Sequence, residues 1–340
     1  MIDLVIIIIS WNVRPLLQRC LTSIYARTSR DITLHVLVVD NASTDGSAGM
    51  VRETFPQAQL IANDENVGFT RGNNQALEAL GFCDRRLEKG KGKREKGKRD
   101  KGEWRTKQVQ ATSLPRYVLL LNPDSEILDD ALPTMVQFMD SQPDVGVVGP
   151  QLLFPDGTIQ SSRRRFPSLA TAFLESTVLQ QWWPDNPVVC RYYVLDQPDS
   201  AVQDVDWVVG ACLMARREAI EEAGLLDEGF FMYSEELDWC RRIKDRGWRV
   251  VYLPTVQVIH HEGKSSEQVV PARHIHFQRS KVRYFRKHHG RPAALALRLF
   301  LLLTYICQLL LEATKWVLGH KRPLRRERVA AYWQVIRSRL

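Results

Sequence analysis

The apolar residues in the first half of the chain fall in short unbroken runs separated by polar segments. Runs of about four to eight residues bounded by turn residues are typical of strands buried on both faces of a parallel sheet. Between these runs, apolar residues recur at helical spacing. The predicted strands are residues 4–10, 34–40, 59–62, 117–121 and 145–154, and the predicted helices are residues 15–26, 45–55, 75–80 and 130–140.

Alternation of strand and helix predicts an α/β fold, because consecutive parallel strands need a crossover, usually a helix, between them. We expect residues 1–266 to form one Rossmann-like domain with a mainly parallel sheet flanked by helices. Its pattern is interrupted at residues 85–110, which are rich in Lys and Gly. Such a segment cannot bury enough apolar surface to offset its ordering entropy, so we expect a disordered surface insertion.

The last part of the chain has a different pattern, and we treat residues 267–340 as a helical extension. Residues 293–311 are almost entirely apolar, with the single charge of Arg298. As a helix they would span about 28 Å, close to the roughly 30 Å of a bilayer core. Basic sequence flanks both ends, so charge bias gives no orientation. We favour a helix in the membrane plane, anchored by its basic flanks and Trp316; a helix packed on protein is the alternative.

The net charge of +8 divides unevenly along the chain. Residues 85–107 carry +8, residues 264–340 carry +14, and the remainder carries −14. An acidic core argues against binding of nucleic acid, whereas a basic extension favours an anionic membrane surface. The six cysteines form no CxxC pair, which fits a reducing compartment.

Asp124 follows the strand at 117–121, after Asn122 and Pro123. Ligands of α/β sheets bind beyond the carboxyl ends of strands, which favours a metal or phosphate site at Asp124. A simple turn explains the same residues, because Asn-Pro-Asp-Ser is good turn chemistry.

The second strand also ends in an acid, Asp40, followed by Asn41 and Ser43. A carboxylate there can accept hydrogen bonds from a nucleoside. The alternative, that this stretch caps the next helix, suits Asp45. The following loop, NVGFTRGNN, supplies Asn66, Gly68 and Arg71, which suit close backbone approach and a phosphate.

Two later segments combine titratable groups. In FFMYSEELDW, the acids Glu235, Glu236 and Asp238 follow three aromatic residues, and apolar surroundings raise a carboxyl pKa toward a useful value for a general base. The alternative is a structural role, because the helix dipole stabilises acidic side chains at the N-terminus of a helix. In VQVIHHEG, His260 ends an apolar strand, and one neutral imidazole with Asp124 could bind a divalent metal.

The seven motifs IIIISWN, VVDNASTDGS, NVGFTRGNN, LLLNPDSEI, WVVGACLMARREA, GLLDEGFFMYSEELDWCRRIKDRGWRV and VIHHEGKSS occur in this order. Together, over about residues 3–266, they resemble glycosyltransferase family 2, in particular its rhamnosyltransferase-like branch. The resemblance implies a GT-A fold, a mixed and mainly parallel sheet. It also implies inverting transfer of a sugar from a nucleotide-diphosphate donor to an acceptor hydroxyl.

Site roles follow from the resemblance position by position. Asp40 matches the acid that contacts the nucleotide, and Asn122-Pro123-Asp124 matches the metal-binding DxD with its first acid replaced. Glu236 matches the catalytic base, with Glu235 as the second candidate, and His260 matches the histidine near the end of the domain, with His261 as its alternative. Mg²⁺ or Mn²⁺ is the expected metal. Trp207 and Trp239 suit either sugar stacking or core packing.

The sequence thus predicts a metal-dependent inverting hexosyltransferase that moves rhamnose or a similar sugar to a glycan or lipid-linked acceptor of a surface polysaccharide. We expect it at the cytoplasmic, inner face of the plasma membrane, peripheral or monotopic, and a homodimer is compatible with the extension. The alternatives are a non-catalytic nucleotide-sugar-binding subunit and a basic membrane-tethering protein.

Overall fold

A computed structural model describes residues 2–27, 31–83, 114–177, 182–183, 185–261 and 270–340. The predicted insertion at 85–110 lies outside the described residues. By internal contacts the chain divides into two compact units. The first unit comprises Met1–Arg163, Asp199–Glu228 and Glu236–Glu262, and the second comprises Arg164–Pro198, Gly229–Glu235 and Gly263–Leu340.

This division differs from the one read from the sequence. Residues 164–198 and 229–235 were assigned to the catalytic domain by their position along the chain, yet they group with the C-terminal segment. Contacts between segments far apart in sequence decide compactness, and a linear reading does not contain them.

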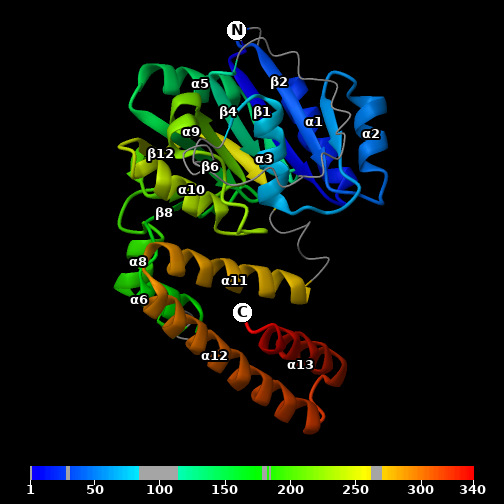
Figure 1. Cartoon of the computed structure of the whole chain (residues 1–340), viewed down its shortest axis with the longest axis vertical. Helices are drawn as coiled ribbons and strands as arrows, with labels where there is room; N and C mark the ends of the chain where they lie inside the picture. The colour runs from blue at the N-terminus through cyan, green and yellow to red at the C-terminus, as the bar shows by residue number, and fades with distance from the viewer. Residues whose placement is uncertain (1, 28–30, 84–113, 178–181, 184, 262–269) are drawn as a thin grey trace, which may run out of the picture. The chain divides into compact units, whose positions relative to one another are not determined.

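The first unit is a mixed sheet flanked by helices (Figure 1). Its strands are ordered β3-β2-β1-β4-β11-β6-β12-β5. The pairs β1–β2, β1–β4, β2–β3 and β6–β12 are parallel, while β11 runs antiparallel to both β4 and β6. The strands are β1 (Leu4–Ser10), β2 (Leu34–Asp40), β3 (Gln59–Ala62), β4 (Tyr117–Leu121), β5 (Ser125–Ile127), β6 (Val145–Leu153), β7 (Ile159–Gln160), β9 (Gln203–Val205), β11 (Cys212–Arg216) and β12 (Arg249–His260). A short pair, β8 (Arg163–Arg164) with β10 (Trp207–Val208), lies where the chain leaves this unit.

Every residue of β1 and β4 is buried, which explains their unbroken apolar runs. The helices of this unit are α1 (Arg14–Ala26), α2 (Ser47–Thr54), α3 (Phe69–Ala79), α5 (Ala131–Ser141), α9 (Arg217–Ala223) and α10 (Glu235–Lys244), whose first residue groups with the second unit. The predicted mixed, mainly parallel sheet is confirmed.

One helix boundary was predicted wrongly. The helix expected at 75–80 begins at Phe69, so Arg71 belongs to a helix rather than to a loop. Helix α3 packs closely on β1: a Cβ added at Gly72 would lie 3.2 Å from Ile9 Cγ2. This tertiary contact stabilises a first turn whose Gly and Asn residues have low helix propensity.

The second unit contains the remaining helices (Figure 1). They are α6 (Leu169–Glu175), α8 (Pro187–Tyr192), α11 (Val270–His288), α12 (Arg291–Val317) and α13 (Arg322–Arg337). Within this unit, α12 packs against α11, α13 and α6. The predicted apolar helix at 293–311 is present and longer, at 27 residues.

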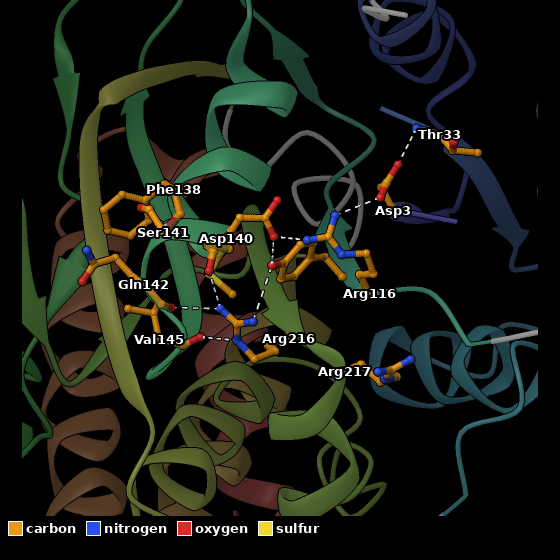
Figure 2. Close-up of polar contacts among 12 residues, drawn as sticks. Asp3, Thr33, Arg116, Phe138, Asp140, Ser141, Gln142, Val145, Arg216 and Arg217 are labelled. Carbon is orange, nitrogen blue, oxygen red and sulfur yellow. Dashed lines mark hydrogen bonds and ion pairs between the residues drawn. The ribbon is translucent and has the colours of Figure 1, made fainter. Parts of the chain in front are cut away.

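Arginines tie the first unit together at the end of the sheet where β1, β4 and β6 begin (Figure 2). Arg216, the last residue of β11, donates from Nε to the Val145 carbonyl at 2.8 Å and from Nη2 to the Gln142 carbonyl at 2.9 Å. It also reaches the carbonyl of Met139, so it caps the C-terminus of α5. Arg116 bridges Asp3 and Asp140 beside it.

We expect Arg216→Ala to lower stability by about 1–3 kcal/mol, because it leaves several carbonyls at a helix end without their charged donor. The measurement is the thermal midpoint of the purified chain. Arg217→Ala is the matched control: the Arg217 side chain is about a third exposed and forms a surface ion pair with Glu218, so the midpoint of this variant should barely move. Equal shifts for the two variants would contradict the capping role.

Candidate functional site

The carboxyl ends of β1 and β2 place two buried polar residues side by side. Ser10 and Asp40 are opposite each other in the parallel register, and Asp40 is only 3% exposed. The Asp40 Oδ2 atom accepts from the Ser43 backbone N–H at 2.9 Å. Its Oδ1 atom and the Ser10 hydroxyl are buried and have no hydrogen-bond partner among the described residues. Since a buried acceptor without a donor is costly, Asp40 is suited to receive an N–H or O–H of a ligand.

The neighbouring predicted residues shape the loops around Asp40. Asn41 is buried; it donates to the Gly68 carbonyl at 3.1 Å and accepts from the Asn63 amide at 2.9 Å. Ser43 accepts from the backbone N–H of Asn12 at 2.9 Å. These two side chains therefore join the turn after β2 to the turns before α3 and after β1.

The loop before α3 ends at Gly68, whose φ of +88° is readily adopted only by glycine. Asn66 accepts from the Gly68 N–H at 3.0 Å and so fixes this turn. Arg71 is exposed in the first turn of α3. The N-terminus of α3 and the exposed Arg71 side chain together present positive charge beside the carboxyl ends of β1 and β2.

Asp45 caps the next helix, as expected. It accepts from the Ser47 N–H at 3.0 Å and from the Arg14 N–H at 2.7 Å, so it serves the starts of α2 and α1 together. Burial acts to raise the pKa of Asp45, but these hydrogen bonds outweigh burial and lower it.

A second group of polar residues lies where β4 ends and β12 ends. Asp124 and His260 are both buried, and the Asp124 Oδ1 atom lies 3.4 Å from His260 Nε2. The side-chain amide of Asn122 is also 3.4 Å from His260 Nε2. The structure thus brings together three residues that are up to 138 positions apart in the sequence.

Gln160 in β7 orients this histidine, and sequence reasoning missed it. Its Oε1 atom lies 2.8 Å from His260 Nδ1. When this oxygen accepts, Nδ1 carries the proton and Nε2 presents its lone pair toward Asp124. No motif contains Gln160, and only the pairing of β7 with β6 places it there.

His261 faces a different partner. Its Nε2 atom lies 2.7 Å from Glu126 Oε1, and its backbone N–H donates to the Asp124 carbonyl at 2.9 Å. Successive residues of a strand point to opposite faces, so only His260 shares a face with the Asp124 side chain.

The three acids near the start of α10 have different environments. Asp238 is fully buried and pairs with Arg242 at 2.8 Å, and Arg242 in turn donates to the carbonyls of Ala223 and Leu225. This ion pair attaches α10 to the turn after α9. Because Asp238 is bound within the protein, we do not assign it a role as a base.

Glu236 lies against the backbone of Gly210. A Cβ added at Gly210 would meet the Glu236 side chain at 3.4 Å. The Glu236 Oε2 atom is buried and has no hydrogen-bond partner among the described residues. Burial raises the pKa of Glu236 above its ordinary value of 4.5, although backbone hydrogen bonds from its own residue, Gly210 and Leu237 act in the opposite direction. Glu235, the other candidate, is 4% exposed.

Residues 210 and 211 connect Glu236 to the Asp124 group. The Ala211 carbonyl accepts from the Asn122 N–H at 2.9 Å and from the Ser125 hydroxyl at 3.3 Å. Glu236 therefore contacts Gly210, and the next residue, Ala211, is hydrogen-bonded to the segment that carries Asp124. The motif WVVGA was visible in the sequence, but nothing in it indicated this bridging position.

The two tryptophans belong to the core. Trp239 is fully buried and donates from Nε1 to the Gly224 carbonyl at 2.8 Å, and Trp207 is 8% exposed. Of the two interpretations of these residues, packing is the one that fits their burial.

Among the described residues, no group of three or more His, Cys, Asp or Glu side chains could hold a metal ion. Asp124 with His260 supplies two ligands, one carboxylate and one imidazole, and this set suits a divalent cation only if a ligand contributes more oxygens.

The chain is similar to known proteins in both sequence and fold. The family model described as "Glycosyltransferase like family 2" matches residues 3–274. The N-acetylglucosaminyl-diphospho-decaprenol L-rhamnosyltransferase of Mycobacterium tuberculosis is 28% identical over 270 residues, 79% of either chain. Rhamnosyltransferase WbbL of Escherichia coli K12 is 30% identical over 148 residues, 43% of this chain and 52% of the relative.

Two solved structures share the fold. The mannosyltransferase PcManGT from Pyrobaculum calidifontis, in complex with GDP-Man and Mn²⁺, superposes with a TM-score of 0.53 at 20% identity, covering 98% of this chain and 85% of that one. GalNAc-T7 with UDP, GalNAc and Mn²⁺ gives a TM-score of 0.50 at 13% identity, covering 83% of this chain and 48% of that one. At these identities the likeness concerns the fold alone.

Proposed function

The chain belongs to glycosyltransferase family 2, in its rhamnosyltransferase-like branch, and has the GT-A fold, and from this premise we propose that it is an inverting hexosyltransferase. It transfers rhamnose or a similar sugar from a nucleotide-diphosphate donor to a hydroxyl of a glycan or lipid-linked acceptor. The proposal rests on the Glu236 carboxyl, which lies against Gly210. The next residue, Ala211, accepts a hydrogen bond from the backbone N–H of Asn122, in the segment that carries Asp124.

The donor nucleotide binds at the carboxyl ends of β1 and β2. The Asp40 Oδ1 atom accepts from a donor group of the nucleoside, since it is buried and lacks a partner among the described residues. Asn41, Ser43, Asn66 and Gly68 hold the surrounding turns in place. Arg71, on the first turn of α3, and Asn122, beside His260, are the polar groups that we assign to the donor's phosphates.

Asp124 and His260 are the residues that would hold Mg²⁺ or Mn²⁺. They fit such an ion because both are buried, face each other and leave an imidazole lone pair toward the carboxylate. Two ligands would not complete a coordination shell, so the diphosphate of the donor would have to supply further oxygens. When bound, the metal neutralises negative charge on the departing diphosphate.

Glu236 accepts the proton of the acceptor hydroxyl. As the acceptor oxygen forms its bond to the anomeric carbon, the bond from that carbon to the diphosphate oxygen breaks, and the proton moves to the Glu236 carboxylate. A carboxyl with a raised pKa is better matched to this task at neutral pH than an ordinary one. Glu235 is the alternative base, because it is the adjacent acid of the same helix start.

We place the protein at the cytoplasmic face of a membrane, attached through the C-terminal segment and acting in surface polysaccharide synthesis. One relative is named for a diphospho-decaprenol acceptor, and an acceptor of that class, a sugar on a lipid diphosphate, resides at a membrane surface. Among the described residues, α12 is the one helix long and apolar enough to cross a bilayer.

The two faces of α12 favour a helix in the membrane plane over a spanning one. Leu297, Leu301 and Tyr305 are buried within the second unit, where the Tyr305 hydroxyl lies 3.2 Å from His274 Nδ1 of α11. The opposite face is apolar and exposed. At about 100° per residue, Leu295, Leu299, Leu303, Ile306, Leu310 and Val317 fall within an arc of about 80°, while the exposed Leu311 and Trp316 lie outside this arc.

Spanning would also draw the neighbouring helices into lipid. Helices α11 and α13 pack on α12 and carry many Lys and Arg residues. Each such charge costs about 2.5–3.5 kcal/mol at a bilayer centre. A helix lying in the interface inserts the exposed apolar face and leaves these charges at anionic headgroups.

The metal role predicts that Asp124→Asn and His260→Asn weaken Mn²⁺ binding in the presence of donor by about 10-fold or more. Electron paramagnetic resonance of free Mn²⁺ measures this without turnover. His261→Asn is the control, because its ring faces Glu126. If His261→Asn alone weakened binding, the ligand assignment would be reversed, and unchanged binding in all three variants would remove the metal site.

The base role predicts that Glu236→Gln lowers kcat by about 100-fold or more while donor affinity is retained. Glu53→Gln, at an exposed position of α2, is the control. Normal transfer by Glu236→Gln would refute the assignment, and loss of transfer only in Glu235→Gln would move the role to the alternative. Donor binding without transfer or hydrolysis in the wild-type chain would instead indicate a binding subunit.

The raised pKa of Glu236 also predicts how the stability of the Glu236→Gln variant depends on pH. An acid whose pKa is higher in the folded state contributes stability below its unfolded pKa, and this stability is lost as pH rises through the folded value. Glu236→Gln should therefore raise the thermal midpoint near neutral pH, and the gain should disappear below about pH 4. A gain that is constant with pH would contradict burial of an ionisable Glu236.

The membrane role predicts that Leu299→Lys with Leu303→Lys weakens binding to vesicles containing phosphatidylglycerol by about 10-fold or more, since each buried leucine contributes about 1.5–3 kcal/mol. Co-sedimentation measures it. Leu195→Lys, at another exposed leucine of the second unit, is the control and should bind normally. If the double variant bound vesicles normally but changed from dimer to monomer in light scattering, the exposed face would be a protein interface.

A further inference from the structure

The segment Gly229–Tyr233, which leads to the acids of α10, lies along one face of α11. Both belong to the second unit. The Ser280 hydroxyl donates to the Met232 carbonyl at 2.8 Å. The ring of His276 stacks on Phe231, with centroids 4.5 Å apart and planes 21° apart.

Further contacts extend this face of α11 along the segment. The Arg283 guanidinium lies 5.1 Å from the centroid of the buried ring of Phe230. It also occupies the space beside Gly229, where an added Cβ would collide with it. Phe277 meets Tyr233 edge to face, with centroids 5.6 Å apart.

The contacting positions of α11 are spaced as one helical face. His276, Ser280 and Arg283 follow a spacing of four and three residues, and Phe277 borders them. The segment as a whole therefore contacts about two successive turns of α11. A segment held at this many points has few alternative conformations.

The backbone after these contacts is strained. Tyr233 and Ser234 are consecutive non-glycine residues in the left-handed region, with φ of +70° and +65°. Such conformations persist where surrounding contacts determine them, and they cluster at functional sites. Immediately after this double turn, α10 begins at Glu235 and Glu236.

We propose that α11 is a positioning element for the catalytic base. Through Ser280 and His276 it holds the segment 229–234, so that the left-handed residues Tyr233 and Ser234 keep the backbone conformation that precedes Glu236. The inference rests on the proposed function, because it assigns α11 a role only if Glu236 accepts the acceptor's proton. The contacting face of α11 then has a positioning role in addition to the role of the C-terminal segment in membrane attachment. Burial, and the nearby cation of Arg279, lower the pKa of His276, so its ring is neutral and stacks on Phe231 without charge.

The experiment measures kcat, acceptor KM and donor affinity in the full chain with Ser280→Ala and His276→Ala. We expect kcat to fall by about 10-fold to 100-fold, because a displacement of about 1 Å at a reacting group costs that much. Donor affinity should not change, since the nucleotide site is formed by other segments. Ser280→Thr keeps the hydroxyl and His276→Phe keeps the ring, so both should recover most of the lost kcat.

A double-substitution cycle separates positioning from general packing. If α11 acts through Glu236, adding Ser280→Ala to Glu236→Gln should lower the residual rate by less than about twofold, because the two changes remove the same contribution. Arg286→Ala, at an exposed position of α11, is the matched control and should behave like the wild type.

Three results would overturn the proposal: a kcat within about twofold of wild type in both alanine variants, additive losses in the cycle, or an equal loss of donor affinity. Where an alanine variant fails to fold, as judged by circular dichroism, Ser280→Thr and His276→Phe provide the comparison, and a loss of kcat in either would also count against it. Full activity of Glu236→Gln would instead refute the base itself, so failure of the proposed function is distinguishable.

Discussion

The position of β11 in the sheet is the constraint on which the site depends. This strand runs antiparallel between β4 and β6, and its first residue, Cys212, pairs with Leu121, the last residue of β4. The two residues before it, Gly210 and Ala211, are therefore held at the carboxyl edge of the sheet. There the Ala211 carbonyl binds the Asn122 segment, and Gly210 lies against the Glu236 side chain. Without this register, the acid and the Asp124 group would have no shared neighbour.

Burial separates the charged groups of the first unit into two kinds. Asp238 is buried with Arg242, which also satisfies backbone carbonyls, so the pair holds α10 in place without an unpaired charge. Glu236, two residues earlier, is half-buried, and desolvation of its carboxyl raises its pKa. Removing water raises the cost of ionisation at both positions, and the arginine paired with Asp238 offsets that cost. The same helix therefore supplies an anchor and a candidate base.

The helices at the end of the chain take part in specific contacts within the second unit. Its helix α12 is apolar on a packed face and on an exposed face, and its one acid, Glu312, is bound by Arg325 of α13. Its helix α11 receives the segment that precedes Glu236. One compact unit therefore contains both the exposed apolar face and the segment that leads to the acids of α10.

The sequence determined the five strands of its first half, the order of motifs and the family, but not β11. Strands such as β2 and β3 have the predicted bounds because their apolar runs and flanking turn residues are local signals. It also indicated Asp40, Asp124 and His260 as candidates, because residues at the carboxyl ends of strands share one edge of a sheet. Tertiary structure alone decided the rest. Gln160 reaches His260 across 100 residues, Gly210 meets Glu236, α3 starts early because it packs on β1, and residues 229–233 join α11. Each of these depends on contacts between segments distant in the chain, and no periodicity or local propensity in a single sequence records which segments will meet.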